Sequence, residues 1–203
     1  MHHINKRIGI LASGRGSNLQ AIIDKLPELP VEVAVVISDN REAFALKRAE
    51  KAGIPTRIIE RKGKSQAEFE LALVEVLKST QVDFVVLAGF MRILGRDFLS
   101  NAPGPVINIH PSLLPSFPGL HAQAQALNYG VKITGCTVHF VDEGMDTGAI
   151  IAQRSVAVVD GDDEESLVSR ILEQEHLLLP EVIKLLALGR IVLENKKVRM
   201  LEE

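Results

Sequence analysis

The stretch "RIGILASGRGSNLQAIIDKL" (residues 7–26) decides the fold class. It opens with "RIGILAS", a near-continuous apolar run of the kind found in strands that are buried on both faces. The glycine-containing segment "SGRGSN" follows, and the remainder of the stretch is helix-like. A strand that leads through a short loop into a helix predicts one unit of a parallel α/β sheet.

The same alternation continues along the chain to residue 109. Gly53 and Pro55 end the second helical stretch, as helix stop signals do. The strict alternation predicts an α/β fold with an open, doubly wound, mostly parallel sheet and helices on both faces. Further strands are expected at 31–38, 54–60, 83–89 and 105–109, and further helices at 42–53 and 65–80.

The rhythm of the sequence changes after Pro111. We expect one domain over residues 1–203, with a phosphate- or nucleotide-binding half at 1–110 and a closing half at 111–203. Pro180 predicts a kink or a break in a helical segment of the closing half. The elements expected there are an irregular loop at 112–122, antiparallel strands at 132–141 and 148–159, one helix or two over 164–188, and a hairpin at 190–201.

The composition argues against several classes of protein. The net charge of −3 gives no basic footprint for nucleic acid. No apolar run approaches the ~18 residues of a membrane span, and the opening "MHHINKR" lacks the apolar core of a secretory signal. Cys136 is the only cysteine, which excludes an internal disulfide and predicts a small buried strand residue. We therefore expect a cytoplasmic protein that acts on small molecules, without nucleic-acid or membrane partners.

The loop "SGRGSN" (residues 13–18) has the features of an anion site. Its backbone N–H groups and the start of a helix favour negative charge, and Ser17 or Asn18 is expected to cap that helix. Leu19 stands where a dinucleotide fingerprint needs a glycine, and a Walker lysine is absent, so we expect a single phosphate monoester. Two alternatives stay open: a plain strand-to-helix turn, and a dinucleotide whose ribose would bind Asp39.

The polar residues near position 110 are the candidates for catalysis. Asn108 and His110 point to the same side of a strand, at its carboxyl end. Asp146 comes from the loop after the next long strand, where Asp142 and Glu143 are rivals for its role. An amide can stabilise an oxyanion, a histidine can move a proton, and a carboxylate can orient that histidine. This set suits attack on a carbonyl group.

Structural interpretations compete with this hypothesis. A buried histidine is often satisfied by backbone, and an asparagine before a loop often forms a turn. A metal site of His110, His121 and Asp146 is conceivable, but the sequence has no tight ligand spacing such as HExxH. No serine lies in a GxSxG elbow, so a hydrolase triad is not indicated.

The chain resembles the folate-dependent formyltransferases nearly from end to end. The resemblance rests on several motifs that occur in the family's order, and it is narrowest to the enzymes that formylate glycinamide ribonucleotide. The motifs are "SGRGSNLQAI" (13–22), "ISDN" (37–40), "VVLAGFMRIL" (85–94), "NIHPSLLP" (108–115), "FPGLHAQAQAL" (117–127), "GCTVHFVDEGMDTG" (135–148) and "EQEHLLLPEVI" (173–183).

The resemblance implies a role for each matching residue. The catalytic residues would be Asn108, His110 and Asp146. The phosphate and the rest of the ribonucleotide would bind Gly16, Ser17, Asn18 and Glu175. The folate would contact Met91, Arg92, Ile93, Leu94, Asn108, Val141, Asp142 and Asp146. Without the resemblance, residues 91, 93 and 94 would be assigned to core packing, and Arg92 and Glu175 to solvated helix charges.

The implied reaction is transfer of the formyl group of 10-formyltetrahydrofolate to the glycinamide amine, in de novo purine (IMP) biosynthesis. The folate is a co-substrate and no metal is implied; the chain would act as a monomer or homodimer. Alternatives are a 10-formyltetrahydrofolate hydrolase and a non-catalytic folate- or nucleotide-binding module. The chain departs from the family pattern at Gln66, where some members have a basic residue near the folate tail.

Overall fold

The computed structural model describes residues 6–201. His2 and His3, in the opening stretch "MHHINKR", lie outside the described residues. The chain divides into two compact units, Met1–Asn108 (unit 1) and Ile109–Glu203 (unit 2). The expectation of one domain with a change of character after residue 110 stays a prediction.

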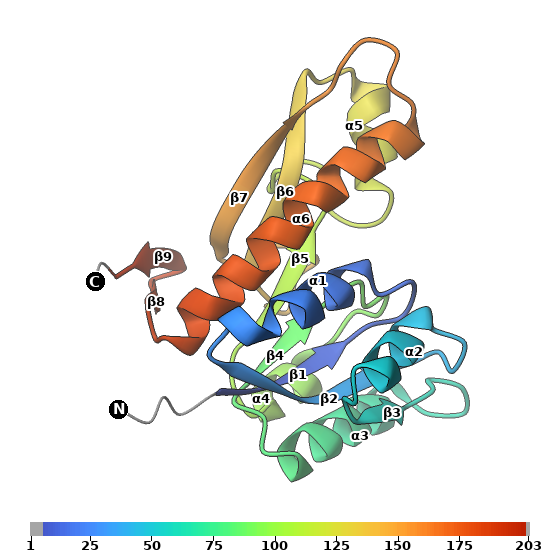
Figure 1. Cartoon of the computed structure of the whole chain (residues 1–203), viewed down its shortest axis with the longest axis vertical. Helices are drawn as coiled ribbons and strands as arrows, with labels where there is room; N and C mark the ends of the chain where they lie inside the picture. The colour runs from blue at the N-terminus through green and yellow to red at the C-terminus, as the bar shows by residue number, and fades with distance from the viewer. Residues whose placement is uncertain (1–5, 202–203) are drawn as a thin grey trace. The chain divides into compact units, whose positions relative to one another are not determined.

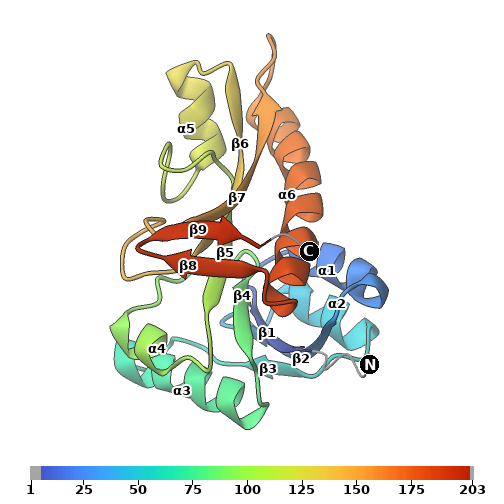
Figure 2. The same cartoon turned by 90° about the vertical axis from the view of Figure 1, so that its left-hand side faces the viewer.

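Unit 1 is built around parallel strands. Its strand order is β3-β2-β1-β4-β5, and Figure 2 shows α1 and α2 on one side of these strands and α3 and α4 on the other. The strands are β1 (Lys6–Leu11), β2 (Val31–Ser38), β3 (Thr56–Ile58), β4 (Phe84–Leu87) and β5 (Val106–His110), whose last two residues belong to unit 2. The helices are α1 (Ser17–Lys25), the short 3-10 helix η1 (Leu26–Glu28), α2 (Phe44–Lys51), α3 (Gln66–Ser79) and α4 (Arg96–Asn101).

Close packing fixes how β1 meets its neighbours. Ile8, Ile10 and Leu11 are fully buried, as the continuous apolar run predicts. A Cβ atom on Gly9 would lie 2.3 Å from the Leu77 side chain of α3, so glycine lets the helix approach the strand. Tight contact between strand and helix is therefore encoded at this position.

Unit 2 contains an antiparallel pair of strands that is covered by a long helix. Residues pair from Ile133 with Ala157 to His139 with Ile150, which confirms the predicted antiparallel addition. Helix α6 runs along this pair, and Figure 1 shows it beside β6 and β7. The elements are α5 (Ala122–Tyr129), β6 (Ile133–Phe140), β7 (Ile150–Ala157), α6 (Glu164–Ala187), β8 (Ile191–Glu194) and β9 (Lys197–Met200).

Helix α6 is one continuous helix, which confirms the alternative of one helix rather than two, and Pro180 does not break it. Asp163 caps it through Ser166, and Pro180 lies inside it with a buried ring. A proline in a helix interior costs ~3 kcal/mol. The buried apolar face offsets that cost, and its members are Leu167, Ile171, Leu178, Leu179, Val182 and Ile183.

Two short helices were not expected from the sequence. They are α4 and α5, whose lengths of six and eight residues carry little periodic signal. The predicted terminal hairpin is present as β8 and β9. Among the described helices, none combines the length and apolar character that crossing a bilayer requires.

Candidate active site

The glycine loop of unit 1 is shaped by backbone contacts. Gly16 precedes α1 with left-handed angles of φ 70° and ψ 32° and is its N-cap, so Ser17 and Asn18 are the first two residues of the helix itself. The expectation that Ser17 or Asn18 caps α1 was therefore wrong. A Cβ atom on Gly16 would lie 2.7 Å from Cα of Ala45, so only glycine fits between α1 and α2. The start of α1 remains suited to an anion, since its first N–H groups have no partner within the helix.

Ser13 joins the glycine loop to the segment that follows β4. Its N–H donates to the carbonyl of Gly89 at 3.0 Å, and its Oγ accepts from the N–H of Met91 at 2.9 Å. The predicted phosphate loop and the start of the predicted folate segment are thus brought together in unit 1. They lie at the carboxyl ends of neighbouring parallel strands, where α/β sheets bind ligands.

The segment 91–94 is mostly exposed. Met91 and Ile93 are each 63% exposed, whereas Leu94 is 3% exposed. Core packing therefore accounts for Leu94 but not for the other two, since solvent-facing apolar side chains at a sheet edge are available to a ligand. Arg92 is not simply solvated, because its Nε lies 2.6 Å from Oδ2 of the buried Asp39.

Glu70 supports the same segment and was missed in the sequence. Its carboxylate is 1% exposed and accepts from the N–H groups of Gly95 at 2.7 Å and Phe98 at 3.0 Å, at the start of α4. Gln66 donates to Glu70 and, at 3.1 Å, to the carbonyl of Ile93. A carboxylate at a helix N-terminus is stabilising. The role of Glu70 could not be predicted, because α4, whose first turn it binds, was not predicted either.

His110 lies at the end of β5 and is 5% exposed. Its Nε2 is 2.9 Å from the carbonyl oxygen of Phe117, and its Nδ1 is 3.4 Å from Oδ2 of Asp146. A carbonyl can only accept, so Nε2 carries a proton, and Nδ1 faces a carboxylate. Both ring nitrogens therefore face oxygen atoms. The structural interpretation predicted that backbone would satisfy His110, and the catalytic one predicted a nearby carboxylate. Both contacts are present.

Asp146 is the acidic residue that faces His110. It has a left-handed φ of 55°, and its Oδ2 also accepts from the N–H of Gly119 at 2.8 Å. Asp142 instead stays within its own loop, where Oδ1 accepts from Gly144 N–H at 3.1 Å and Thr147 Oγ1 at 2.7 Å. Asp142 thus stabilises the loop 141–146. Asp146 is the residue of this loop that forms a cluster with His110.

His139 is a further member of the cluster that was missed in the sequence. It is 2% exposed, and its Nε2 lies 3.7 Å from Oδ1 of Asp146. Burial lowers the pKa of His139 below its usual value, against the opposing effects of the Phe140 carbonyl and the Asp146 charge. This ring is therefore neutral near pH 7. His139 lies within the motif "GCTVHFVDEGMDTG", but that motif gave it no role, and the fold of the connection between β6 and β7 brings it to Asp146.

Asn108 lies on a strand of unit 1, and Glu175 lies on a helix of unit 2. Asn108 is half-buried on β5, paired in register with Leu87, and strand alternation puts its side chain on the same side as that of His110. Glu175 is 4% exposed on α6, so it is not a solvated helix charge. Burial, with the Glu175 charge as a second cause, raises the pKa of Cys136 to about 12. Cys136 is buried in β6, as predicted.

A metal centre finds no support in these contacts. Among residues 6–201, no group of three or more His, Cys, Asp or Glu side chains is arranged to hold a metal ion. His121, the third ligand of the metal hypothesis, is the exposed N-cap of α5, with a φ of 58°.

These features define a doubly wound α/β protein with a carboxylate–imidazole site at the carboxyl end of a strand. The formyl transferase family model matches residues 6–183. The chain therefore belongs to the formyl transferase family, and the resemblance seen in its motifs is confirmed.

Named relatives refine this assignment. The phosphoribosylglycinamide formyltransferase of Bacillus subtilis (strain 168) is 44% identical over 182 residues, which cover 88% of this chain and 93% of that protein. A crystal structure of glycinamide ribonucleotide transformylase 1 from Symbiobacterium toebii matches with a TM-score of 0.96 and 49% identity, covering 100% of this chain and 96% of the other. This likeness confirms the predicted fold class.

Much longer proteins are also similar to the chain. The trifunctional purine biosynthetic protein adenosine-3 of Drosophila pseudoobscura pseudoobscura is 50% identical over 199 residues, and its human counterpart is 46% identical over 201 residues. These matches cover 95% and 97% of this chain but only 15% and 20% of the relatives. The chain thus spans a fifth or less of their length.

Proposed function

We propose that this chain transfers the formyl group of 10-formyltetrahydrofolate to the amine of phosphoribosylglycinamide, a step of purine biosynthesis. The observation that carries the proposal is the pairing of His110 with Asp146 at the end of the strand that also bears Asn108. Membership of the formyl transferase family and the names of the relatives supply the substrates. An amide, an imidazolium and a carboxylate are the groups that acyl transfer to an amine requires.

The proposed reaction begins with attack by the substrate amine on the formyl carbon. A carbon–nitrogen bond forms and the formyl oxygen becomes an oxyanion, which Asn108 and the protonated His110 stabilise. Collapse then breaks the bond between the carbon and N10 of the folate, and a proton passes from the attacking nitrogen to N10. Asp146 acts by holding His110 charged and oriented. Binding both substrates face to face contributes through proximity.

The contact of Nε2 of His110 with the Phe117 carbonyl suggests how the formyl group binds before the attack. The 2.9 Å contact occupies the ring nitrogen that does not face Asp146. We infer that the formyl oxygen replaces the Phe117 carbonyl as the acceptor of the Nε2 proton. The exchange keeps the donor satisfied throughout, which avoids the cost of an unpaired buried group.

Two binding sites accompany the catalytic set in this proposal. The phosphate would bind the backbone at Gly16, Ser17 and Asn18, and Glu175 would contact the same substrate. The folate would contact residues 91–94 and 141–146 together with Asn108. The exposure of Met91 and Ile93 at 63% and of Met145 at 55% supports apolar contacts to a flat ring.

The finer expectations about partners belong to the same proposal. The substrates would be small molecules, the chain would act as a monomer or homodimer, and the reaction would take place in the cytoplasm. Size-exclusion chromatography with light scattering would decide between the two assembly states.

The test of the proposal is an absorbance assay of formyl transfer from a 10-formyl folate, with and without phosphoribosylglycinamide. Turnover that depends on the amine is expected, and turnover without it would indicate a hydrolase instead. Asn108→Ala is expected to lower kcat about 10²- to 10³-fold, the usual cost of losing an oxyanion donor. Asn101→Ala, on the exposed end of α4, is the matched control and should retain full activity. Near-normal turnover by Asn108→Ala would contradict the mechanism.

A further inference from the structure

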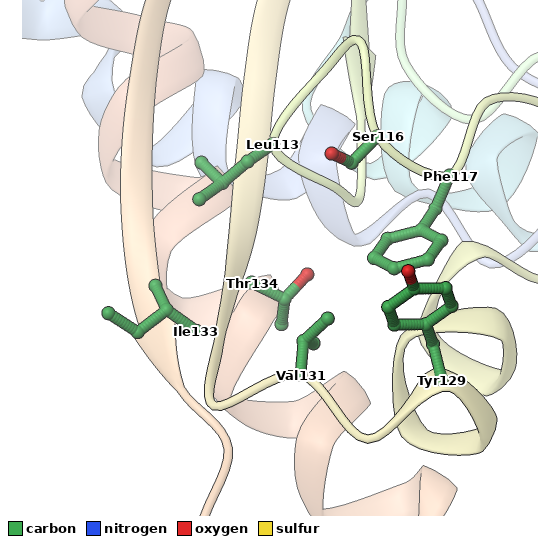
Figure 3. A pocket seen from close by; sticks show the side chains of 7 residues that line it. All are labelled: Leu113, Ser116, Phe117, Tyr129, Val131, Ile133 and Thr134. Atoms are coloured by element: carbon green, nitrogen blue, oxygen red, sulfur yellow. The ribbon is translucent and has the colours of Figure 1, made fainter.

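Unit 2 contains a pocket that the proposed reaction does not use. It is a half-open pocket with a volume of about 370 Å³, which lies within the range of about 300–1,000 Å³ found for small-molecule sites. The walls come from the loop after β5, the end of α5 and the start of β6 (Figure 3). The lining residues are Leu113, Ser116, Phe117, Tyr129, Val131, Ile133 and Thr134.

The chemistry of the lining is apolar and aromatic with isolated hydroxyl groups. The rings of Phe117 and Tyr129 meet edge to face with their centroids 5.9 Å apart. None of the described residues that line the pocket carries a charge. Such a site selects a neutral ring over a charged metabolite, because a charge would lose its hydration without gaining a partner.

Thr134 supplies an unusual polar group. Its side chain is buried, with 2% of the residue exposed, and its Oγ1 has no hydrogen-bond partner among the described residues. Figure 3 shows this hydroxyl directed toward the space between Ser116 and Tyr129. Buried hydroxyl groups are nearly always paired, because an unpaired one is costly. A ligand with one hydroxyl group would satisfy it.

The loop that forms one wall also holds the catalytic cluster. The ring of Phe117 lines the pocket, while its carbonyl oxygen lies 2.9 Å from Nε2 of His110. Two residues later, the N–H of Gly119 donates to Asp146. The beginning of the loop is fixed separately, since Leu114 N–H donates to the buried Thr137 hydroxyl at 3.1 Å. A molecule in the pocket would therefore act on the part of the loop that contacts His110.

We propose that this pocket is a binding site for a small neutral aromatic alcohol, and that its occupancy is sensed at His110 through Phe117. Binding itself is independent of the proposed formyl transfer. Only the effect on turnover rests on that function, so failure of one does not imply failure of the other.

The test is an NMR titration of the full chain with 4-methylphenol, and with toluene as the partner that lacks the hydroxyl. We expect shifts at Tyr129 and Phe117 and at the ring of His110. The alcohol should bind about 2- to 12-fold more tightly than toluene, the ratio that one neutral hydrogen bond provides. In Thr134→Val the preference should disappear while toluene still binds.

A second variant guards against a folding defect in Thr134→Val. Val131→Phe fills the pocket with Thr134 intact and should abolish binding of both probes, whereas Val159→Phe, at an exposed site outside the pocket, should not. The proposal is overturned if neither probe binds at millimolar concentration, if the preference survives in Thr134→Val, or if binding survives in Val131→Phe. Shifts at Tyr129 without any at His110 would overturn the link to the cluster.

Discussion

Each unit places an aspartate beside a basic side chain, and the two pairs are built differently. In unit 1, Asp39 is met by Arg92 at 2.6 Å, and its other oxygen has no hydrogen-bond partner among the described residues. In unit 2, Asp146 faces imidazoles at 3.4 Å and 3.7 Å, His110 and His139, and accepts from a backbone N–H. A guanidinium stays charged at every relevant pH, whereas an imidazole gains and loses its proton near neutrality.

The difference separates a fixed contact from a reactive one. The Asp39–Arg92 pair, with the glycine packing at Gly16, holds segments expected to bind substrates. The Asp146 cluster contains groups whose charge can change during a reaction. A buried ion pair alone therefore does not identify a catalytic site; the titratable partner does.

The largest expected effect is on catalysis in unit 2. Asp146→Asn should lower kcat about 10²-fold, within the range for loss of acid–base function, because His110 loses the charge that orients it. The double variant Asp146→Asn/His110→Ala should be no slower than His110→Ala alone, since the two residues act as a unit. Both are measured by the absorbance assay. Asp160→Asn, a fully exposed carboxylate, serves as the control. Additive losses of kcat in the double variant would show that the two residues act independently, which would contradict this expectation.

The next effect concerns the fixed packing of unit 1. Gly16→Ala should destabilise the fold by about 2 kcal/mol, because a side chain in the left-handed region costs about 1–2 kcal/mol and the new Cβ would also press on Ala45. Gly14→Ala should be nearly neutral, since no atom of the described residues lies within 4 Å of its added Cβ. Urea denaturation compares the two variants. Equal stability would show that the loop is not fixed by this contact.

The same pair of glycines tests the phosphate site. A bulky residue at position 14 should raise KM for phosphoribosylglycinamide more than KM for the folate, without the folding defect expected at Gly16. Steady-state kinetics with each substrate varied in turn measures the two constants. Equal changes in both would contradict a phosphate site in this loop.

A smaller effect is expected from opening the ion pair of unit 1. Arg92→Gln should cost about 1 kcal/mol of stability, at the low end for an unsatisfied buried group, because the arginine side chain is 49% exposed and water can replace it. Asp39→Asn should cost less, since no buried charge remains. Urea denaturation ranks the two, and kcat should stay within a few-fold of wild type in Asp39→Asn. A loss of kcat comparable to that of Asp146→Asn would erase the distinction between the pairs.

The smallest effect is the pH dependence of stability in unit 2. The pKa of His139 is lowered in the folded state by burial, so the unfolded chain binds more protons below about pH 6.5. The free energy of unfolding is therefore unaffected by His139 above that pH. It decreases as the pH falls from there toward the lowered pKa of the folded state. His139→Gln should therefore flatten the fall in Tm between pH 7 and pH 5, by about 2–4 °C for each kcal/mol involved. An unchanged slope would assign the acid sensitivity to other groups.

Much of unit 1 was predictable because its signals are local. The continuous apolar runs of β1 and β2 and the glycine loop before α1 follow from the chain over one or two elements. The cap of α1 was not predictable, because Gly16 is required by Ala45 in another helix. The role of Glu70 was also not predictable, because its partners lie in another element, at the start of α4. In α6, packing of the apolar face decided whether Pro180 would end the helix.

The sequence by itself determined the class of the fold, the family, and the candidate residues Asn108, His110 and Asp146, because alternating periods and motifs are written in consecutive residues. Only the tertiary structure decided that Asp146, rather than Asp142, faces His110, that His139 joins them, and that Phe117 both contacts His110 and lines a pocket. These contacts join residues on different elements and loops, and their distances depend on packing that no local pattern specifies.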